Sequence, residues 1–339
     1  MTRRLGRTDV ELPELGLGCA PLGDLFEKLC EDVADATLRA AWESGIRFFD
    51  TAPHYGAGLS EHRLGRALRG VPPGDVIVST KVGRVLRPSD APDPAGRGPF
   101  VGGLPFEQEF DYGYDGVHRA LEGSLQRLGR SRVELVAIHD LDLRHHPDPP
   151  VLARHLDDLA TGGAKALDAL RAAGAIRAVG AGVNELGMVP VLLDRVELDY
   201  VILAMPYTLL DQEALDEELP LCGDRGVGVI VGAVFASGIL AAPPLAGATY
   251  GYDVPPPEVA ERVERLRAVC GRHGVPLGTA ALRFPLGHPL VASVIPGAVR
   301  PEQVHENVER LEAPIPGSLW AELKAEGLVR PDAPDPANG

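Results

Sequence analysis

The stretch FFDTAPHYGAGLSEHRLGRAL, residues Phe48 to Leu68, contains the end of an apolar run, a turn of small residues and an amphipathic segment in succession. The apolar run predicts a buried strand, and the three- and four-residue spacing of apolar residues after Ser60 predicts a helix. Asp50 stands where the strand ends, and Tyr55 lies in the turn five residues later. The stretch is therefore one strand–turn–helix unit with two reactive side chains at its junction.

Units of this kind recur along the whole chain. Apolar runs that predict strands lie at residues 15–19, 46–49, 76–80, 133–139, 178–183, 200–204, 228–231 and 291–295. Eight such strands alternating with helices predict an α/β protein with a parallel sheet covered by helices, and they favour a (β/α)8 TIM barrel. An open doubly wound sheet is the alternative, but the segment GLGCAPLG after the first strand lacks its GxGxxG pattern. We expect one domain over residues 1–330 and a loose C-terminal tail over residues 331–339.

The composition argues against several classes of partner. The 339 residues include 33 Lys and Arg against 48 Asp and Glu, a formal net charge of −15 that repels nucleic acid. The four cysteines have no metal-ligand or disulfide-framework spacing, so we expect reduced, buried thiols and no metal. The N-terminus lacks the apolar segment of a signal peptide, and the longest uncharged run is interrupted by prolines. We therefore expect a cytoplasmic protein with no membrane partner; no sequence feature selects an oligomeric state.

Two predicted loops, after the third and seventh strands, are unusually long. They span about residues 82–115 and 233–257. Loops of this length without secondary structure are often binding loops or lids, with a disordered insertion as the alternative. The first loop concentrates aromatic residues, although they make up only 5% of the chain. We expect both loops to form the walls of a substrate pocket that includes Phe106 and Tyr112, with His54 beside Tyr55.

Reactive side chains follow three neighbouring predicted strands. Asp50 and Tyr55 follow the second strand, Lys81 follows the third in VIVSTK, and His139 ends the fourth in LVAIHD. Singly, each residue has an ordinary structural explanation, such as a helix cap or a solvated charge. Together they lie at the end of the barrel where active sites form, and adjacent strands are only about 5 Å apart.

This set suits proton transfer to or from a substrate oxygen. An ammonium group on Lys81 would stabilise the phenolate of Tyr55, Asp50 would hold Lys81 in place, and His139 would orient the substrate oxygen. The oxygen would belong to a carbonyl being reduced or an alcohol being oxidised. Because no protein side chain stores a hydride, the reaction requires a nicotinamide cofactor.

The chain resembles the aldo-keto reductase superfamily from GRTDVELPELGLGC near its N-terminus to VIPGAVRPEQVHEN near its C-terminus. The resemblance implies a (β/α)8 barrel, NAD(P) dependence and the catalytic tetrad Asp50, Tyr55, Lys81 and His139. The segments GGLPFEQEFDYGYDGVHRALEGSLQRLG, IHDLD, GAGVNE and PYTLLDQ most resemble the branch with D-threo-aldose 1-dehydrogenase, L-fucose dehydrogenase and pyridoxal 4-dehydrogenase. That branch implies oxidation of a sugar or of a pyridoxal-like compound.

The resemblance also implies a cofactor site at the ends of the later strands. The candidate positions are Asn184, Phe235, Gly297, Arg300, Gln303, Glu306 and Asn307. Asn184 would hold the nicotinamide carboxamide, and it is also a common helix cap. Gly297 and Gln303 stand where NADP-specific relatives often carry a lysine and an arginine, which favours NAD, whereas Arg300 keeps NADP open.

Two other functions remain open at this point. One is an NADPH-dependent general aldehyde reductase, which would use the same residues in the reducing direction. The other is a regulatory subunit that binds the cofactor without turnover, although such a subunit would not need the complete tetrad.

Overall fold

The structure, a computed structural model, describes residues 1–91, 98–241, 249–251 and 253–336. Its centre is an eight-stranded parallel sheet with the order β12-β11-β10-β9-β8-β5-β4-β3. The strands are β3 (Leu17–Gly18), β4 (Phe48–Asp50), β5 (Ile77–Val82), β8 (Leu135–His139), β9 (Ala178–Val183), β10 (Tyr200–Ala204), β11 (Gly228–Gly232) and β12 (Val291–Ile295). The predicted parallel barrel of eight strands is confirmed.

Bridges between the first and last strands bring the two edges of this sheet together. Leu15 pairs with Val294, and Gly18 pairs with Gly297, both in parallel. A side chain would not fit at Gly18, because a Cβ atom there would lie 2.7 Å from the Ile295 carbonyl oxygen. The first strand is shorter than the apolar run 15–19, but these bridges continue its pairing and make the barrel nearly closed.

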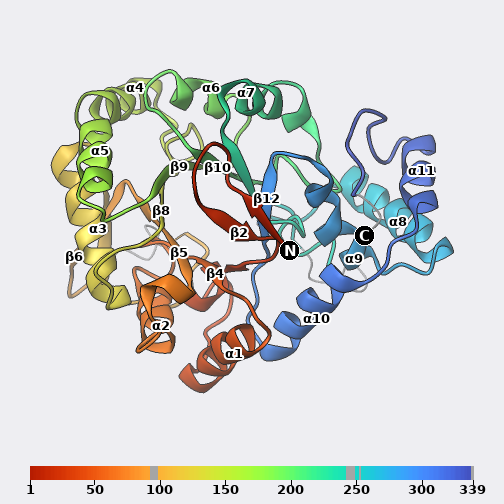
Figure 1. Ribbon diagram of the computed structural model, residues 1–339, viewed down its shortest axis with the longest axis horizontal. Helices are drawn as coiled ribbons and strands as arrows, with labels where there is room; N and C mark the ends of the chain where they lie inside the picture. Colours follow the sequence, from red (N-terminus) through yellow and green to blue (C-terminus); the bar gives the residue numbers. More distant parts are fainter. Residues whose placement is uncertain (92–97, 242–248, 252, 337–339) are drawn as a thin grey trace.

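Helices surround the barrel (Figure 1). They are α1 (Glu31–Glu43), α2 (Leu59–Ala67), α3 (Tyr114–Leu128), α4 (Pro149–Asp158), α5 (Ala164–Ala172), α6 (Met188–Leu193), α7 (Glu218–Arg225), α8 (Pro257–Arg272), α9 (Leu277–Arg283), α10 (Pro301–Glu312) and α11 (Gly317–Ala325). In α3 the buried positions Val117, Leu121 and Leu128 follow the expected three- and four-residue steps, and Gly129 ends the helix in a left-handed conformation with φ of 63°.

An N-terminal hairpin closes one end of the barrel. Strands β1 (Thr2–Arg4) and β2 (Glu11–Pro13) pair antiparallel, and Figure 1 shows this red hairpin in front of the barrel strands. Leu5 and Leu12 are fully buried, in one apolar cluster with the barrel residues Phe48 and Tyr200. The hairpin occupies the end at which the strands begin, so the opposite end, where the strands finish, is available for a site.

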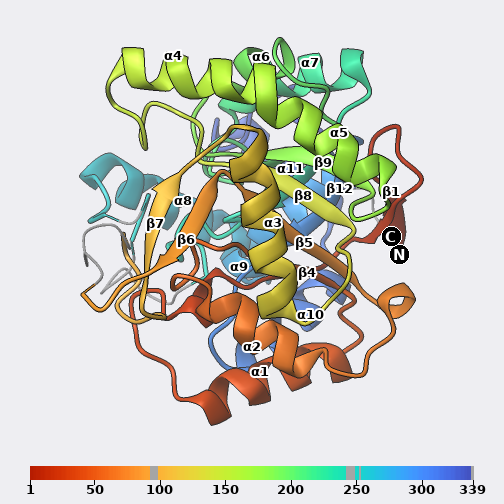
Figure 2. The same ribbon diagram turned by 90° about the vertical axis from the view of Figure 1, so that its left-hand side faces the viewer.

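The long segment after β5 is not a structureless loop. Strands β6 (Arg84–Pro88) and β7 (Phe106–Phe110) form an antiparallel hairpin beside α3, as Figure 2 shows. Partly buried and exposed positions alternate in FEQEF, residues 106–110, as is typical of a strand with two different faces. Residues 92–97 of this segment, and 242–248 and 252 of the second long loop, lie outside the described residues.

Part of the segment expected to be a loose C-terminal tail lies within the described residues. Over residues 331–336 it packs on the barrel: Ala333 is 1% exposed, and Asp335 forms an ion pair with Lys324 at 2.7 Å. Residues 337–339 lie outside the described part. Among the cysteines, Cys19, Cys222 and Cys270 are buried as expected, whereas Cys30 is exposed.

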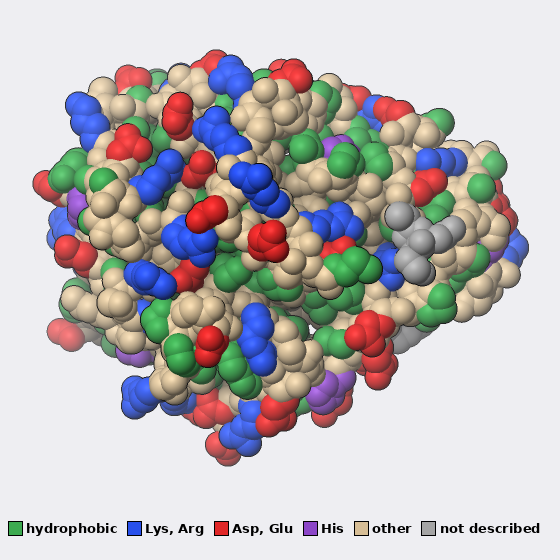
Figure 3. Space-filling view, viewed as in Figure 1, with side chains coloured by type: hydrophobic (Ala, Val, Ile, Leu, Met, Phe, Trp, Pro, Cys, Tyr) green, Lys and Arg blue, Asp and Glu red, His purple; other side chains and the backbone are tan. Residues whose placement is uncertain are grey.

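The surface carries mixed charge. On the face seen in Figure 3, acidic and basic side chains are interspersed rather than gathered into one patch. No helix within the described residues is long and apolar enough to span a membrane.

Candidate active site

Strands β4 and β5 place a buried ion pair at the open end of the barrel. Asp50 pairs in register with Ser79, and Lys81, two residues further along β5, points to the same side as Ser79. Ser79 Oγ donates a hydrogen bond to Asp50 Oδ1 at 2.8 Å, and Lys81 Nζ donates to Asp50 Oδ2 at 2.7 Å. Asp50 and Lys81 are only 3% and 2% exposed.

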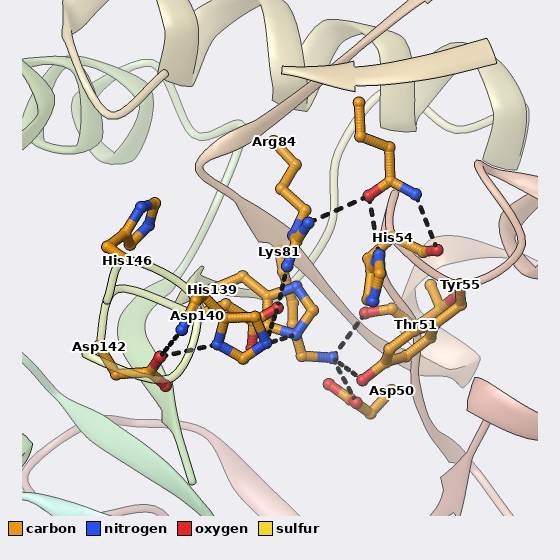
Figure 4. A network of polar contacts seen from close by, with 12 residues as sticks. Asp50, Thr51, His54, Tyr55, Lys81, Arg84, His139, Asp140, Asp142 and His146 are labelled. Atoms are coloured by element: carbon orange, nitrogen blue, oxygen red, sulfur yellow. Dashed lines mark hydrogen bonds and ion pairs between the residues drawn. The ribbon is translucent and has the colours of Figure 1, made fainter. Parts of the chain in front are cut away.

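Tyr55 completes this group from the turn after β4. Its hydroxyl oxygen lies 2.9 Å from Lys81 Nζ, and the same ammonium donates to the Thr51 carbonyl at 2.9 Å (Figure 4). The turn passes so close to residue 23 that a Cβ atom on Gly23 would lie 2.5 Å from the Tyr55 carbonyl carbon. The small residues around Tyr55 are therefore what allow its hydroxyl to reach the lysine.

The charge on Lys81 follows from its neighbours. Burial alone would lower its pKa, but the Asp50 carboxylate and the Tyr55 hydroxyl outweigh burial and raise the pKa above the usual lysine range. Lys81 is therefore a permanent ammonium beside the phenol oxygen.

His139 ends β8 and faces Tyr55. The two ring centroids are 5.8 Å apart with planes at 87°, and His139 is 7% exposed. Burial holds the pKa of His139 well below the usual histidine range, although the neighbouring Asp140 carboxylate acts in the opposite direction. The neutral imidazole can hydrogen-bond a substrate oxygen without adding a charge to the site. The structure thus brings together all four predicted tetrad residues, as Figure 4 shows.

A second layer of polar residues supports the tetrad. Arg84 of β6 forms an ion pair with Asp140 at 2.7 Å, and its guanidinium lies 4.2 Å from the centroid of the Phe110 ring. Its Nη1 also reaches Gln108 Oε1 of β7 at 3.4 Å. Arg84 and Gln108 did not stand out in the sequence because only the β6–β7 hairpin, inside an apparent loop, brings them to the site.

The three residues expected in the substrate pocket have different positions. The His54 ring lies 6.4 Å from the Tyr55 ring and 6.0 Å from the His139 ring, so it borders the tetrad. Phe106 is partly buried at the start of β7, opposite Pro88. Tyr112 departs from the expectation: it is 1% exposed, and its hydroxyl lies 2.8 Å from the His139 carbonyl oxygen, to which it donates. It therefore supports the end of β8 from behind rather than lining a pocket.

Phe100 is a further aromatic residue that borders the site. Its ring centroid lies 5.0 Å from that of His54 and 5.8 Å from that of Tyr55. The concentration of aromatic residues in the first long loop was the signal for such a residue, but composition alone does not say which ring turns inward.

The residues expected at the cofactor lie at the ends of the later strands and on α10. Asn184 follows β9, Phe235 follows β11, and Gly297 follows β12. Gly297 is exposed, whereas Asn307 is 3% exposed and accepts a hydrogen bond from Arg310 at 3.0 Å. Arg310 was not predicted, although it lies on α10 one turn after Glu306 and Asn307.

Arg310 connects several of these residues. Its guanidinium lies 5.2 Å from the Phe235 ring centroid and forms an ion pair with Glu306 at 3.1 Å. Gln303 instead turns toward its own helix end, where its Oε1 accepts from the Val299 amide at 2.7 Å. Arg300 forms a two-point ion pair with Glu27, both contacts at 3.2 Å. This set of amide, carboxylate, guanidinium and aromatic groups beside a helix N-terminus is chemically suited to a dinucleotide.

Comparisons with known proteins agree with this geometry. The model of the aldo/keto reductase family matches residues 14–326. The chain is 43% identical to pyridoxal 4-dehydrogenase from Microbacterium luteolum, over 96% of this chain and 97% of that protein. It is 40% identical to D-threo-aldose 1-dehydrogenase from a Pseudomonas species, over 94% and 95% of the two chains. A solved aldo-keto reductase from Bacillus halodurans, in its holo form, superposes with a TM-score of 0.75 at 27% identity, over 97% and 96% of the two chains. The chain belongs to the aldo/keto reductase family.

Proposed function

We propose that this protein uses NAD⁺ to oxidise an aldose similar to L-fucose or D-arabinose, or a pyridoxal-like substrate, with Tyr55 as the general acid–base. The observation that carries the proposal is the Tyr55 hydroxyl 2.9 Å from a buried Lys81 ammonium. Family membership makes the chain an oxidoreductase for CH–OH and C=O groups, with NAD(P) as the family's cofactor. The direction, the substrate class and the cofactor preference are our proposals.

The tetrad has a defined task in this reaction. The substrate hydroxyl would lie between the Tyr55 oxygen and the His139 ring, and Tyr55 would accept its proton as the C–H bond breaks. The Lys81 ammonium stabilises the phenolate that this proton transfer requires, and Asp50 holds that ammonium in position. A bound nicotinamide supplies the acceptor for the hydride, and in the reverse direction Tyr55 returns the proton to the carbonyl oxygen.

The polar surroundings support a hydroxylated or heteroaromatic substrate. His54 and Gln108 offer hydrogen-bonding groups at the border of the tetrad, and Phe100 offers a ring against which a sugar or pyridine face can pack. Two relatives, at 43% and 40% identity, are a pyridoxal 4-dehydrogenase and a D-threo-aldose 1-dehydrogenase. A general aldehyde reductase would not need these hydrogen-bonding groups beside the tetrad, because simple aldehydes carry no further hydroxyl.

The ion pairs near α10 support NAD rather than NADP. A 2′-phosphate needs a cationic partner, and Arg300 is already paired with Glu27 while Arg310 is paired with Glu306. Carboxylates at this position favour the free ribose hydroxyls of NAD and repel a phosphate.

The test is absorbance of the reduced nicotinamide, with NAD⁺ or NADP⁺ supplied in turn against L-fucose, L-galactose, D-arabinose, pyridoxal and simple aliphatic alcohols. We expect turnover of a sugar or pyridoxal with NAD⁺. Consumption of NADPH with simple aldehydes alone would favour the reductase function. Tight cofactor binding without turnover in either direction would favour the regulatory subunit.

The variant Tyr55→Phe tests the mechanism. It removes only the phenolic oxygen, so we expect turnover to fall by at least about 10²-fold while cofactor affinity stays near the wild-type value. Cofactor titration followed by protein fluorescence measures that affinity. Turnover at the wild-type rate in this variant would exclude Tyr55 as the proton carrier.

A further inference from the structure

His54 borders the tetrad, and its ring is held from one side. Its Nδ1 lies 2.7 Å from Gln108 Oε1, and the Gln108 amide nitrogen donates to the His54 backbone carbonyl at 3.4 Å. Among the described residues the contact with Gln108 Oε1 is the one hydrogen bond of the His54 ring, and it uses Nδ1 rather than Nε2. One ring nitrogen, Nδ1, is therefore hydrogen-bonded to the hairpin, and the other, Nε2, is available for a hydrogen bond in the site.

The orientation of the Gln108 amide is determined by its neighbours. Arg84 Nη1 faces the same Gln108 atom as His54 Nδ1, and a guanidinium can only donate hydrogen bonds. That Gln108 atom must therefore be the amide oxygen, an acceptor. Arg84 is itself fixed by its ion pair with Asp140, so the arrangement is rigid on the hairpin side.

This orientation decides which nitrogen of His54 carries the proton. Because the Gln108 oxygen accepts, Nδ1 must donate and therefore bears the hydrogen. Burial and the nearby Arg84 charge lower the pKa of His54 to about 4, against weaker raising effects of Asp140 and Gln108, so the ring is neutral near pH 7. In a neutral imidazole with a hydrogen on Nδ1, Nε2 is an acceptor.

The position of this acceptor relates it to the reacting carbon. The rings of His54, Tyr55 and His139 form a triangle with centroid separations of 6.4, 5.8 and 6.0 Å. The reacting oxygen must lie near Tyr55 and His139. A hydroxyl one or two carbons further along the substrate is then within reach of the third ring, His54.

We propose that His54 Nε2 accepts a hydrogen bond from a hydroxyl one or two carbons away from the reacting carbon, and that Gln108 is the positioning residue that fixes the accepting tautomer. The inference rests on the proposed function and deepens it, because it defines the substrate class as compounds with such a neighbouring hydroxyl. The C2 hydroxyl of an aldose stands on the adjacent carbon and the 3-hydroxyl of pyridoxal on the carbon after it, whereas simple aldehydes have neither.

The test compares substrates that differ only in this group: L-fucose with 2-deoxy-L-fucose, and pyridoxal with 3-O-methylpyridoxal. For the wild-type enzyme we expect kcat/KM to favour the hydroxylated member of the active pair by about 10- to 100-fold. The variant Gln108→Leu removes the acceptor for Nδ1. We expect it to lower kcat/KM for the hydroxylated substrate more than for its analogue, so that the ratio of the two values falls to within about threefold. Remaining turnover of the analogue shows that this variant has folded.

Glu109→Gln is the matched control, because Glu109 is the next residue of β7 but faces away and pairs with Arg87. It should keep the wild-type ratio. A wild-type ratio near one, or a Gln108→Leu variant that loses both substrates equally, would overturn the role of His54 and leave the proposed function intact. If neither L-fucose nor pyridoxal is oxidised with either cofactor, the proposed function fails and the inference fails with it.

Discussion

Lys81 carries the buried positive charge on which the proposed mechanism depends. Its ammonium contacts a carboxylate, a backbone carbonyl and a phenol, and it is almost completely buried. A buried charge is tolerated only when its partners replace the hydration that it loses. The same contacts that keep Lys81 charged therefore stabilise the fold and, in the proposed mechanism, prepare Tyr55 for proton transfer.

The variant Lys81→Met tests the contribution of the ammonium to stability and its contribution to turnover. It leaves the Asp50 carboxylate buried without its cation, so we expect a loss of about 3–5 kcal/mol in the free energy of unfolding. We also expect turnover to fall by at least about 10²-fold, because nothing then stabilises the Tyr55 phenolate. Urea denaturation and initial rates measure the two quantities.

The double variant Asp50→Asn/Lys81→Met provides the control. Removing both charges should recover part of the lost stability without restoring turnover. A single variant Lys81→Met that retains activity would contradict the role given to the ammonium.

The β6–β7 hairpin borders the candidate active site. His146 is buried against this hairpin. The His146 ring lies 4.3 Å from Phe110 of β7, and its Nε2 lies 3.2 Å from the Tyr112 hydroxyl. Burial, and then the neighbouring His155 and His145, lower the pKa of His146 from 6.5 to about 4. The unfolded chain therefore takes up this proton at a higher pH than the folded chain.

From this shift we predict acid destabilisation of the hairpin region. Below about pH 6.5 the unfolded state binds the proton and gains stability relative to the folded state, so the contribution of His146 to stability decreases between pH 6.5 and 4. In His146→Phe, which keeps an aromatic ring but cannot titrate, the melting temperature should decrease less over this range, by a few degrees. Thermal unfolding at several pH values tests this, and parallel curves for both proteins would contradict it.

Helix α10 and the residue before it, Arg300, are the part of the chain to which the proposed preference for NAD is assigned. Arg300 and Glu27 are both about half exposed, so their ion pair is weak and can be altered without unfolding the protein. In Glu27→Gln, Arg300 is free to approach a 2′-phosphate, and we expect kcat/KM for NADP⁺ relative to NAD⁺ to rise about two- to fivefold.

Glu312→Gln, at the other end of α10, changes the net charge equally and should leave this ratio unchanged. An increase of the same size in both variants would show that overall charge, rather than Arg300, determines the preference.

At the scale of these elements, the sequence predicts some features and not others. Asp50, Lys81 and His139 could be predicted because a strand's end and its order in the barrel follow from apolar runs along the chain. Gln108 could not, because its place depends on a hairpin whose strands are separated by a long connection. Tyr112 was misjudged for a related reason: an aromatic residue in a polar loop has the same local pattern whether it faces the pocket or the core.

At the scale of the whole molecule, the two ends of the barrel have different roles: one end contributes to stability, and the other holds the candidate active site. The N-terminal hairpin buries Leu5 and Leu12 against the strand beginnings, whereas the tetrad lies where the strands finish. This division is general in (β/α)8 barrels, in which one face carries the active site and the other supports the fold. Substitutions at the closed end should therefore change stability without changing the chemical step.

Leu12→Ala tests this division. Leu12 is fully buried, and its removal leaves a cavity between the hairpin and the barrel, so we expect a loss of about 2–5 kcal/mol in the free energy of unfolding. The kcat of the folded fraction at 25 °C should stay at the wild-type value, because Leu12 packs where the strands begin and the tetrad lies where they finish. Glu11→Ala, at the neighbouring exposed position of β2, should change stability by less than about 0.5 kcal/mol. A marked loss of kcat in Leu12→Ala, with the protein still folded, would show instead that the closed end of the barrel determines the geometry of the tetrad.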